Sequence, residues 1–358
     1  PVPLSWQELS EWADALDEKI PEGQRVKPGA LRRFCNKEES ARQGFRRRLT
    51  ETPGVVATSE EVLGTSLRVL EWKTDHKPSE KLLAAIDKVR KTWETPNGDI
   101  ITEAVDMWRH MRELALGFWY RWNPPAPRDW LEARRAWKSH VREVLRHNRR
   151  RLDTELQVWN ECERSESPPR VWTDWKEIRD EFRPNTVAEW IDDHAIRNCL
   201  RWLVHNDGIC WVEHRAFGEQ LAQVARVPYF GAGDDRILDT EETAIVASIR
   251  AHSQGKNLER WSRNLVPCPM TSGKEWEQLL GRTHRPGQEA DEVICEVGLD
   301  WPELAASFEQ ARADALYIED TIGQRQKLNY ADLVITDTKE PRSGSGFSHS
   351  AREGGKEG

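Results

Sequence analysis

The sequence lacks closely spaced cysteines, a metal-ligand pattern and long hydrophobic runs. Its six cysteines are never closer than eleven residues apart, which excludes zinc-finger and thioredoxin-type spacings, and we interpret them as reduced, mostly buried thiols. The ten histidines form no His-Glu-x-x-His pattern, so no metal site is predicted. No run approaches the roughly 18 apolar residues of a membrane-spanning helix, and the start has no signal-peptide pattern. These absences favour a cytoplasmic protein without membrane contact.

The charge also lacks a strong excess of one sign. There are 53 Lys and Arg against 61 Asp and Glu, a net charge of −8, which excludes a uniformly basic nucleic-acid binder but leaves room for local basic regions. The 358 residues suit two domains and can bury a sizeable core. Tryptophan is unusually frequent, 18 residues against 4 tyrosines, and its amphipathic placement predicts core or interface anchors. Because the chain begins at Pro1 without methionine, we expect a fragment or a processed product.

The first half has the pattern of a Trp-rich helical region. Apolar residues recur at helical spacing in three segments, residues 79–91, 100–116 and 128–152. Ser79 has the position of an N-cap for the first of these helices. The polar, proline-rich stretch at 165–169 ends the pattern. We therefore predict a helical accessory region over residues 1–170 and a linker over residues 171–184.

The second half changes to short apolar runs that alternate with helical segments. The runs lie at residues 209–212, 244–249, 264–266 and 293–297. This alternation predicts an α/β lobe over residues 185–338, with a mostly parallel sheet and helices on both faces. Thr186 and Glu189 have capping-box spacing and predict the start of a helix that Asp207-Gly208 ends. Residues 339–358 are rich in Gly, Ser and charge, which predicts a disordered tail.

The most informative segment begins at Ser272, which forms a second capping box with Glu275. One face of the predicted helix is apolar, and the opposite face carries Gln278, Arg282 and Arg285. Two guanidinium groups on one helix suit a ligand rich in oxyanions, because their planar fork matches phosphate and never deprotonates. Two arginines alone would more often belong to a solvated basic face, but they stand here in a longer and more specific string.

That string resembles a helicase motif. Residues 278–288 read Gln-Leu-Leu-Gly-Arg-Thr-His-Arg-Pro-Gly-Gln and resemble motif VI of superfamily 2 helicases, closest to the Swi/Snf-like translocase branch. Residues 252–258, His-Ser-Gln-Gly-Lys-Asn-Leu, are similar to motif V, and residues 209–214, Ile-Cys-Trp-Val-Glu-His, resemble motif IV. The order and spacing match the second, C-terminal RecA-like lobe of such enzymes over roughly residues 185–332. The helical first half has no comparable motif.

The resemblance implies roles for individual residues. Arg282 and Arg285 would be arginine fingers, which neutralise charge on the γ-phosphate of ATP during hydrolysis, and Gln278 would help to hold the geometry between two lobes. Gly255 and Asn257 would face the nucleotide or the partner lobe. The remaining candidates, near the edge where the lobe would meet a nucleic-acid backbone, are His214 and Ser253.

Two further motifs of a complete ATPase are absent. No Gly-x-x-x-x-Gly-Lys-Ser/Thr loop is present, and no acidic Asp-Glu box follows an apolar strand in the first half. The resemblance then implies that ATP and Mg²⁺ are held mainly by a first RecA-like lobe outside this chain, in cis or in trans. We expect the C-terminal portion of an ATP-dependent DNA helicase or duplex-DNA translocase, inactive alone. The alternative is a non-enzymatic nucleic-acid-binding or scaffold module.

Two local basic regions favour contact with nucleic acid. Residues 31–50 hold seven Lys and Arg against two Glu, and residues 128–151 hold nine against three acidic residues. A charged helix face is often only solvated, but beside a helicase-like lobe it suits neutralisation of phosphates in duplex DNA. The residues predicted to make these contacts are Arg149, Arg150 and Arg151.

Overall fold

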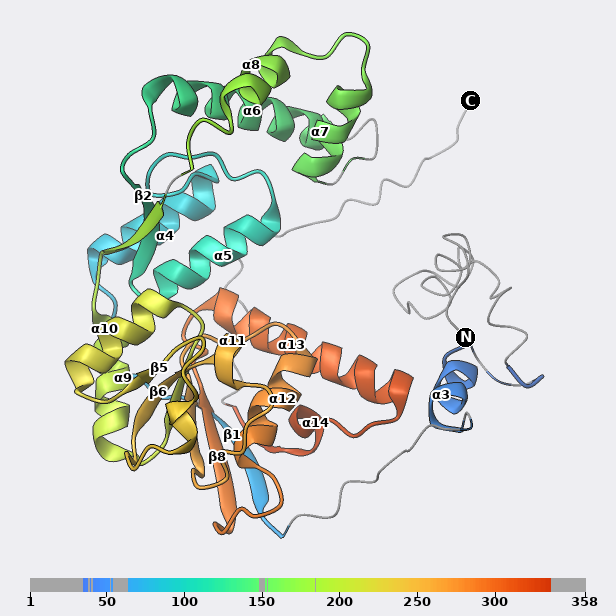
Figure 1. Cartoon of the computed structure of the whole chain (residues 1–358), viewed down its shortest axis with the longest axis vertical. Helices are drawn as coiled ribbons and strands as arrows, with labels where there is room; N and C mark the ends of the chain where they lie inside the picture. The colour runs from blue at the N-terminus through green and yellow to red at the C-terminus, as the bar shows by residue number, and fades with distance from the viewer. Residues whose placement is uncertain are drawn as a thin grey trace, which may run out of the picture.

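The structure is a computed structural model of the chain. It describes residues 35–37, 39, 41–51, 53, 64–147, 152, 154–183 and 185–335. Figure 1 shows a large sheet with helices on both sides and, at one end of it, a separate group of helices. Two predictions lie outside the described residues, namely the disordered tail over 339–358 and the contacts of Arg149, Arg150 and Arg151.

The large sheet has seven strands in the order β5-β6-β4-β7-β8-β1-β9, and every neighbouring pair is parallel. The strands are β1 (Ser66–Glu71), β4 (Ile209–Val212), β5 (Tyr229–Phe230), β6 (Ile245–Ser248), β7 (Arg263–Val266), β8 (Glu292–Val297) and β9 (Asp332–Val334). Four of them, β4, β6, β7 and β8, coincide with the predicted apolar runs. The predicted α/β fold class with a parallel sheet is therefore confirmed.

Helices cover both faces of this sheet, as alternate residues of β4 illustrate. Ile209 and Trp211 belong to the core shared with one set of helices, whereas Cys210 and Val212 belong to the core on the opposite face. The first set is α12 (Gly273–Thr283), α13 (Pro302–Ile322) and α14 (Lys327–Tyr330), and the second is α9 (His194–His205) and α10 (Arg215–Ala225). Two short helices, η2 (Asp235–Leu238) and α11 (Ile249–His252), flank β6. A strand buried on both faces needs apolar residues throughout, which explains the continuous runs.

Strand β1 departs from the predicted all-helical region over residues 1–170. It lies between β8 and β9, with Val69 opposite Cys295 and Leu333. Leu67 and Val69 are buried in the same core as α12 and α13. The sheet thus takes a strand from the first half of the chain, and the helical region is inserted after it.

A second departure concerns Thr186 and Glu189, which do not cap a helix. They lie in β3 (Asn185–Trp190), which pairs antiparallel with β2 (Phe118–Asn123). The predicted helix start is therefore wrong, and α9 begins only at His194. Pairing with the aromatic residues of β2 outweighs the local capping pattern, because strand formation depends on cross-strand neighbours that the local sequence does not contain.

The helical region contains α4 (Glu80–Thr92), α5 (Ala104–Ala115), α6 (Arg128–His147), α7 (Glu155–Arg164) and α8 (Arg170–Ile178). Ser79 caps α4 as predicted, because its side chain accepts a hydrogen bond from Leu82 N–H. The linker predicted over 171–184 is wrong at its start, since α8 occupies it. Trp172 and Trp175 of α8 pack in one core with Trp137 of α6, which holds this segment in place.

Asp192 joins the helical region to the sheet. Its carboxylate accepts hydrogen bonds from Ser79 N–H at 2.6 Å and from His194 N–H at 2.6 Å, so it holds the first turns of α4 and α9 together. Burial alone would raise the pKa of this carboxyl group, but the hydrogen bonds outweigh burial and lower the pKa from 3.8 to about 2. An ionised Asp192 is therefore part of the junction.

A further helix, α3 (Ala41–Glu51), packs against α13. Arg42 connects them through an ion pair with Asp320 at 3.0 Å and by lying over the Tyr317 ring. Within the described ranges, no helix combines the length and the apolar character that crossing a bilayer requires.

Candidate functional site

Helix α12 carries the two arginines of the motif VI-like segment and is tightly fixed. Its apolar face is buried as predicted, with Trp276, Leu279 and Leu280 in the core beneath the sheet. Its start differs from the prediction, because the Ser272 side chain makes no capping hydrogen bond. Gly273 N–H instead donates to the Asp314 carboxylate of α13 at 2.7 Å.

The close contact of α12 with α13 explains the glycine at position 273. A Cβ atom there would lie 2.5 Å from Ala315 N and 2.9 Å from Ala311 O. Only a residue without a side chain allows the two helices to approach this closely. The position of α12, and of the arginines at its end, is thereby set.

Arg282 is held by two backbone carbonyl groups. Its Nε donates to Gln278 O at 2.9 Å and its Nη1 donates to Lys256 O at 2.8 Å. Burial lowers the pKa of Arg282, and the positive charge of Arg285 lowers this pKa further. The guanidinium is fixed in one place, and no described carboxylate pairs with it.

Arg285 follows α12 and turns toward the same loop. Its Nη1 donates to Asn257 Oδ1, whereas its Nε is buried and has no hydrogen-bond partner in the described part of the chain. A buried donor without a partner is costly, by about 1–3 kcal/mol. The two guanidinium groups therefore lie near each other with unused hydrogen-bonding capacity.

The motif V-like loop, which contains Gly255 and Asn257, contacts the two arginines. Leu258 N–H donates to Arg282 O at 3.0 Å, which ties the loop to the end of α12. Gly255 has a φ of +72°, in the left-handed region that favours glycine. No atom lies within 4 Å of where its Cβ would be, so the glycine is needed here for its conformation and not for a close approach within the chain.

Gln278 lies one turn before Arg282 on α12. Its carbonyl accepts from Arg282, but its side-chain Oε1 is buried without a hydrogen-bond partner among the described residues. Among the described residues it makes no hydrogen bond with Arg285 or with the loop. Its expected role between two lobes stays a prediction.

His214 and Ser253 are not brought to the arginines. His214 precedes α10 and packs between Phe118 and Tyr120, with ring centroids 5.5 and 5.9 Å away. Burial lowers the pKa of His214. Ser253 is buried after α11, and its N–H bonds to Ile249 O. Their expected contacts with nucleic acid stay predictions.

Three residues that sequence reasoning missed support the site. Asn264 is fully buried in β7 and donates to Thr283 Oγ1 at 3.1 Å, while accepting from Trp211 Nε1 at 3.0 Å. Gln288 donates to Thr283 O at 2.9 Å and thereby closes the turn after α12. Lys256 supplies the carbonyl that holds Arg282. The sequence contained a signal for two of them: Asn264 is an amide inside an apolar run, and Gln288 is the last residue of the motif VI-like string.

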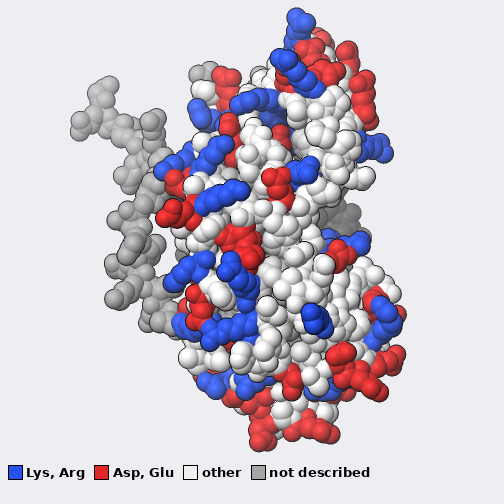
Figure 2. Space-filling model, turned by 90° about the vertical axis from the view of Figure 1, so that its left-hand side faces the viewer, with Lys and Arg blue, Asp and Glu red and all other residues white. Residues whose placement is uncertain are grey.

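Arg282 and Arg285 are among the cations of the chain that form no ion pair with a described carboxylate. Lys and Arg are interspersed with Asp and Glu along the face that Figure 2 displays. Many cations have an acidic partner, such as Lys256 with Asp235 at 2.6 Å and Arg134 with Asp99 at 2.8 Å. Arg282 and Arg285 depart from this pattern of compensated charge.

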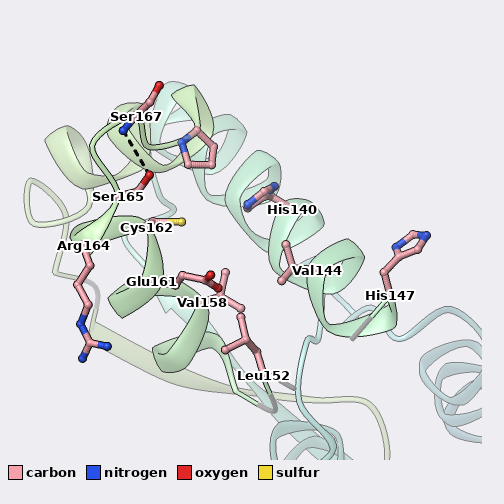
Figure 3. A pocket seen from close by; sticks show the side chains of 11 residues that line it. His140, Val144, His147, Leu152, Val158, Glu161, Cys162, Arg164, Ser165 and Ser167 are labelled. Atoms are coloured by element: carbon pink, nitrogen blue, oxygen red, sulfur yellow. Dashed lines mark hydrogen bonds between the residues drawn. The ribbon is translucent and has the colours of Figure 1, made fainter. Parts of the chain in front are cut away.

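A hollow of about 580 Å³ lies in the helical region, far from α12 in the chain. Figure 3 shows His140 and Val144 on α6 at one side of it and Val158 and Cys162 on α7 at the other. Burial lowers the pKa of His140. Within the described ranges, no three His, Cys, Asp or Glu side chains are arranged to hold a metal ion.

Comparison with known proteins finds likeness among solved structures. No family model and no curated protein matches the chain. Among solved structures, it is similar to a crystal structure of the C-terminal part of the Fun30 ATPase domain, with 11% sequence identity and a TM-score of 0.37, over 69% of this chain and 88% of that one. At this similarity, the functional argument rests on the residues of the chain itself.

Proposed function

We propose that this chain is the C-terminal lobe of an ATP-dependent duplex-DNA translocase or helicase, and that Arg282 and Arg285 complete its nucleotide site. The observation that carries the proposal is the convergence of two guanidinium groups on the loop with Gly255 and Asn257, with no carboxylate partner among the described residues. A cation pair of this kind suits the charge that develops on a transferred phosphoryl group.

The two arginines would act differently. Arg282 is held by two carbonyls and is preorganised, so it would meet the phosphate without rearrangement. Arg285 has Asn257 as its hydrogen-bond partner and a buried Nε without one, so its side chain would turn to offer this open donor to a phosphate oxygen. In this proposal Asn257 positions Arg285, and Gln278 lies where a partner lobe would approach.

The residues of the site fit the phosphate groups of ATP but not its magnesium ion. Asp235, the acidic residue paired with Lys256 beside the loop, is exposed and engaged in that ion pair. ATP and Mg²⁺ would therefore be held mainly by a first lobe, supplied in cis or in trans. When bound, ATP supplies the reactive phosphoanhydride. This chain supplies the positive charge of Arg282 and Arg285 and one side of the nucleotide site.

The test is nucleic-acid-stimulated ATP hydrolysis by the natural protein that includes a first lobe. Arg282→Ala and Arg285→Ala are expected to lower turnover by about 10³-fold or more, with nucleotide binding retained. Arg312→Ala is the matched control, because Arg312 is a surface residue of α13 paired with Glu309. Turnover that is indifferent to both site variants would contradict the assignment. Absence of any turnover in the natural assembly would favour the nucleic-acid-binding or scaffold module.

Duplex DNA is the proposed partner, through Arg149, Arg150 and Arg151 among other basic residues. Binding measured by fluorescence anisotropy is expected to fall steeply with salt, because it releases counterions from the phosphates. Replacing the three arginines with alanine is expected to reduce the salt slope by about 3. An unchanged slope would remove these residues from the interface. His214 and Ser253 would contribute only if the lobe edge rearranges, since both are partly or fully buried.

A further inference from the structure

A cavity with a cationic lining lies in the helical region, away from the proposed nucleotide site. It has a volume of about 400 Å³ and is formed by the end of α4, the segment that follows it, and the last turns of α6. Lys91, Arg142 and Arg146 line it together with Trp93, and no described Asp or Glu does.

Arg142 is fixed at the wall of this cavity by the backbone. Its Nη2 donates to Trp93 O at 2.7 Å and to Ile101 O at 3.0 Å. Burial lowers the pKa of Arg142; the carboxylate of Glu94 opposes this change, and the charge of Arg146 adds to it. The guanidinium thus has its orientation set by neutral carbonyls while its charge is not matched by an ion pair in the described ranges.

The nearby acids are already engaged elsewhere. Asp87 pairs with Lys91 at 2.6 Å, and Glu94 pairs with Arg135 at 3.6 Å. Arg146 is exposed, lies one turn after Arg142 on α6, and makes no ion pair with a described residue. Arg142 is therefore held in one orientation at the wall of the cavity, and Arg146 lines the same cavity without an ion pair to a described residue.

We propose that this cavity binds a phosphate group. Two guanidinium groups offer several N–H donors to tetrahedral oxygens, and the positive charge of each is better compensated by an anion than by water in a partly buried place. The phosphate can belong to a nucleic-acid backbone or to a small phosphorylated molecule, since both present the same group. In the sequence, Arg149, Arg150 and Arg151 continue the basic stretch beyond Arg146.

This inference is independent of the arginine-finger proposal, because it concerns other residues and its readout is binding without ATP hydrolysis. Loss of turnover in the Arg282 and Arg285 variants and loss of binding here can therefore be told apart. The two proposals can fail separately.

The test compares Arg146→Glu with Arg128→Glu in the full chain. Both residues are exposed on α6, but Arg128 lies outside the cavity and pairs with Glu132. Two probes are used, a fluorescein-labelled DNA duplex followed by anisotropy and inorganic phosphate followed by calorimetry. Arg146→Glu is expected to weaken binding of at least one probe about tenfold, against about twofold or less for Arg128→Glu.

The pattern of loss identifies the source of the phosphate. Weakened duplex binding that inorganic phosphate does not compete assigns the site to a nucleic-acid backbone, and weakened binding of inorganic phosphate assigns it to a small phosphorylated ligand. Arg142→Lys, which keeps the charge but loses the fork, is expected to reproduce the loss while circular dichroism stays unchanged. Equal effects of Arg146→Glu and Arg128→Glu on both probes, or no binding of either probe by the unmodified chain, would overturn the proposal.

Discussion

Two arginine pairs in this chain share a local arrangement but lie in regions of different construction. Arg282 with Arg285 and Arg142 with Arg146 each lie at or just beyond the end of a helix, and in each pair one guanidinium is held by two backbone carbonyls. In each pair the pKa of that arginine is lowered, first by burial and also by the charge of its neighbour.

The regions around the two pairs differ in how they fix them. Helix α12 is clamped between the parallel sheet and α13, with Gly273 in direct contact with the α13 backbone. Helix α6 is held by a core of tryptophans, including Trp137, without a sheet. In both regions a packed core holds the helix that carries an arginine pair, and this core is built on a sheet for α12 and on tryptophans for α6. Each arginine pair should therefore be affected only by substitutions that destabilise its own region.

The largest effect is expected from Trp137→Ala. Trp137 is fully buried between α6 and α7, so its truncation is expected to lower the free energy of unfolding of the helical region by about 3–5 kcal/mol. Hydrogen exchange should then rise in α6 and leave α12 protected. Trp108→Ala, at a partly exposed position, is the matched control and should change little. Equal loss of protection in α12 would show that the two regions unfold as one cooperative unit, and it would contradict the expectation that each region supports its own arginine pair.

A smaller effect is expected at the junction, from Asp192→Asn. The folded-state pKa of Asp192 lies below its ordinary value, so the ionised form stabilises the fold at neutral pH, and this contribution is lost as the pH falls from 3.8 toward 2. The variant is expected to be less stable by about 2 kcal/mol at neutral pH and to show a weaker loss of stability in that acidic interval. Denaturant unfolding at several pH values measures both. An unchanged acid profile would show that the hydrogen bonds from Ser79 and His194 do not favour the ionised carboxylate.

The smallest of the three effects is expected from Asn257, the hydrogen-bond partner of Arg285. Asn257→Asp places a carboxylate beside Arg285 and converts an uncompensated pair into a compensated one. Stimulated ATP turnover by the natural protein is expected to fall about tenfold, which corresponds to roughly 1.4 kcal/mol, because Arg285 would be partly neutralised before phosphate arrives. Asn257→Ala should lower turnover by less, since it removes positioning without adding charge. Turnover unaffected by the aspartate would mean that Arg285 does not act through its free charge.

Local periodicity predicted the elements whose burial or capping leaves a pattern in their own sequence. The apolar runs of β4, β6, β7 and β8 and the N-cap of α4 at Ser79 followed from the sequence, because burial on two faces and capping leave their pattern within a few residues. The two helicase-like segments also singled out Arg282, Arg285, Gly255 and Asn257, and in the structure hydrogen bonds join the two segments; the roles expected of these residues stay predictions.

β1 and β3 were not predicted as strands, because their own sequences do not show which distant strands they pair with. β1 belongs to the sheet only because β8 and β9 accept it, and β3 is a strand only because β2 lies opposite. Asp314 takes the capping role expected of Ser272, from a helix some forty residues away. Arg142 could not be singled out from the sequence either, since its carbonyl partners lie in a loop that precedes α6 by tens of residues.

The position of β1 has a consequence for how the chain reaches its native state. Ser66 and Asp291 are joined by a hydrogen bond at the start of β1 and β8, yet they are 225 residues apart. During synthesis β1 emerges 225 residues before β8 and has no partner strand in the sheet until β8 has left the ribosome, while the helical region between them can already bury its tryptophans. Long-range parallel pairing of this kind closes late and slowly. Between the synthesis of β1 and that of β8, therefore, the backbone groups along both edges of β1 have no strand of this sheet to pair with.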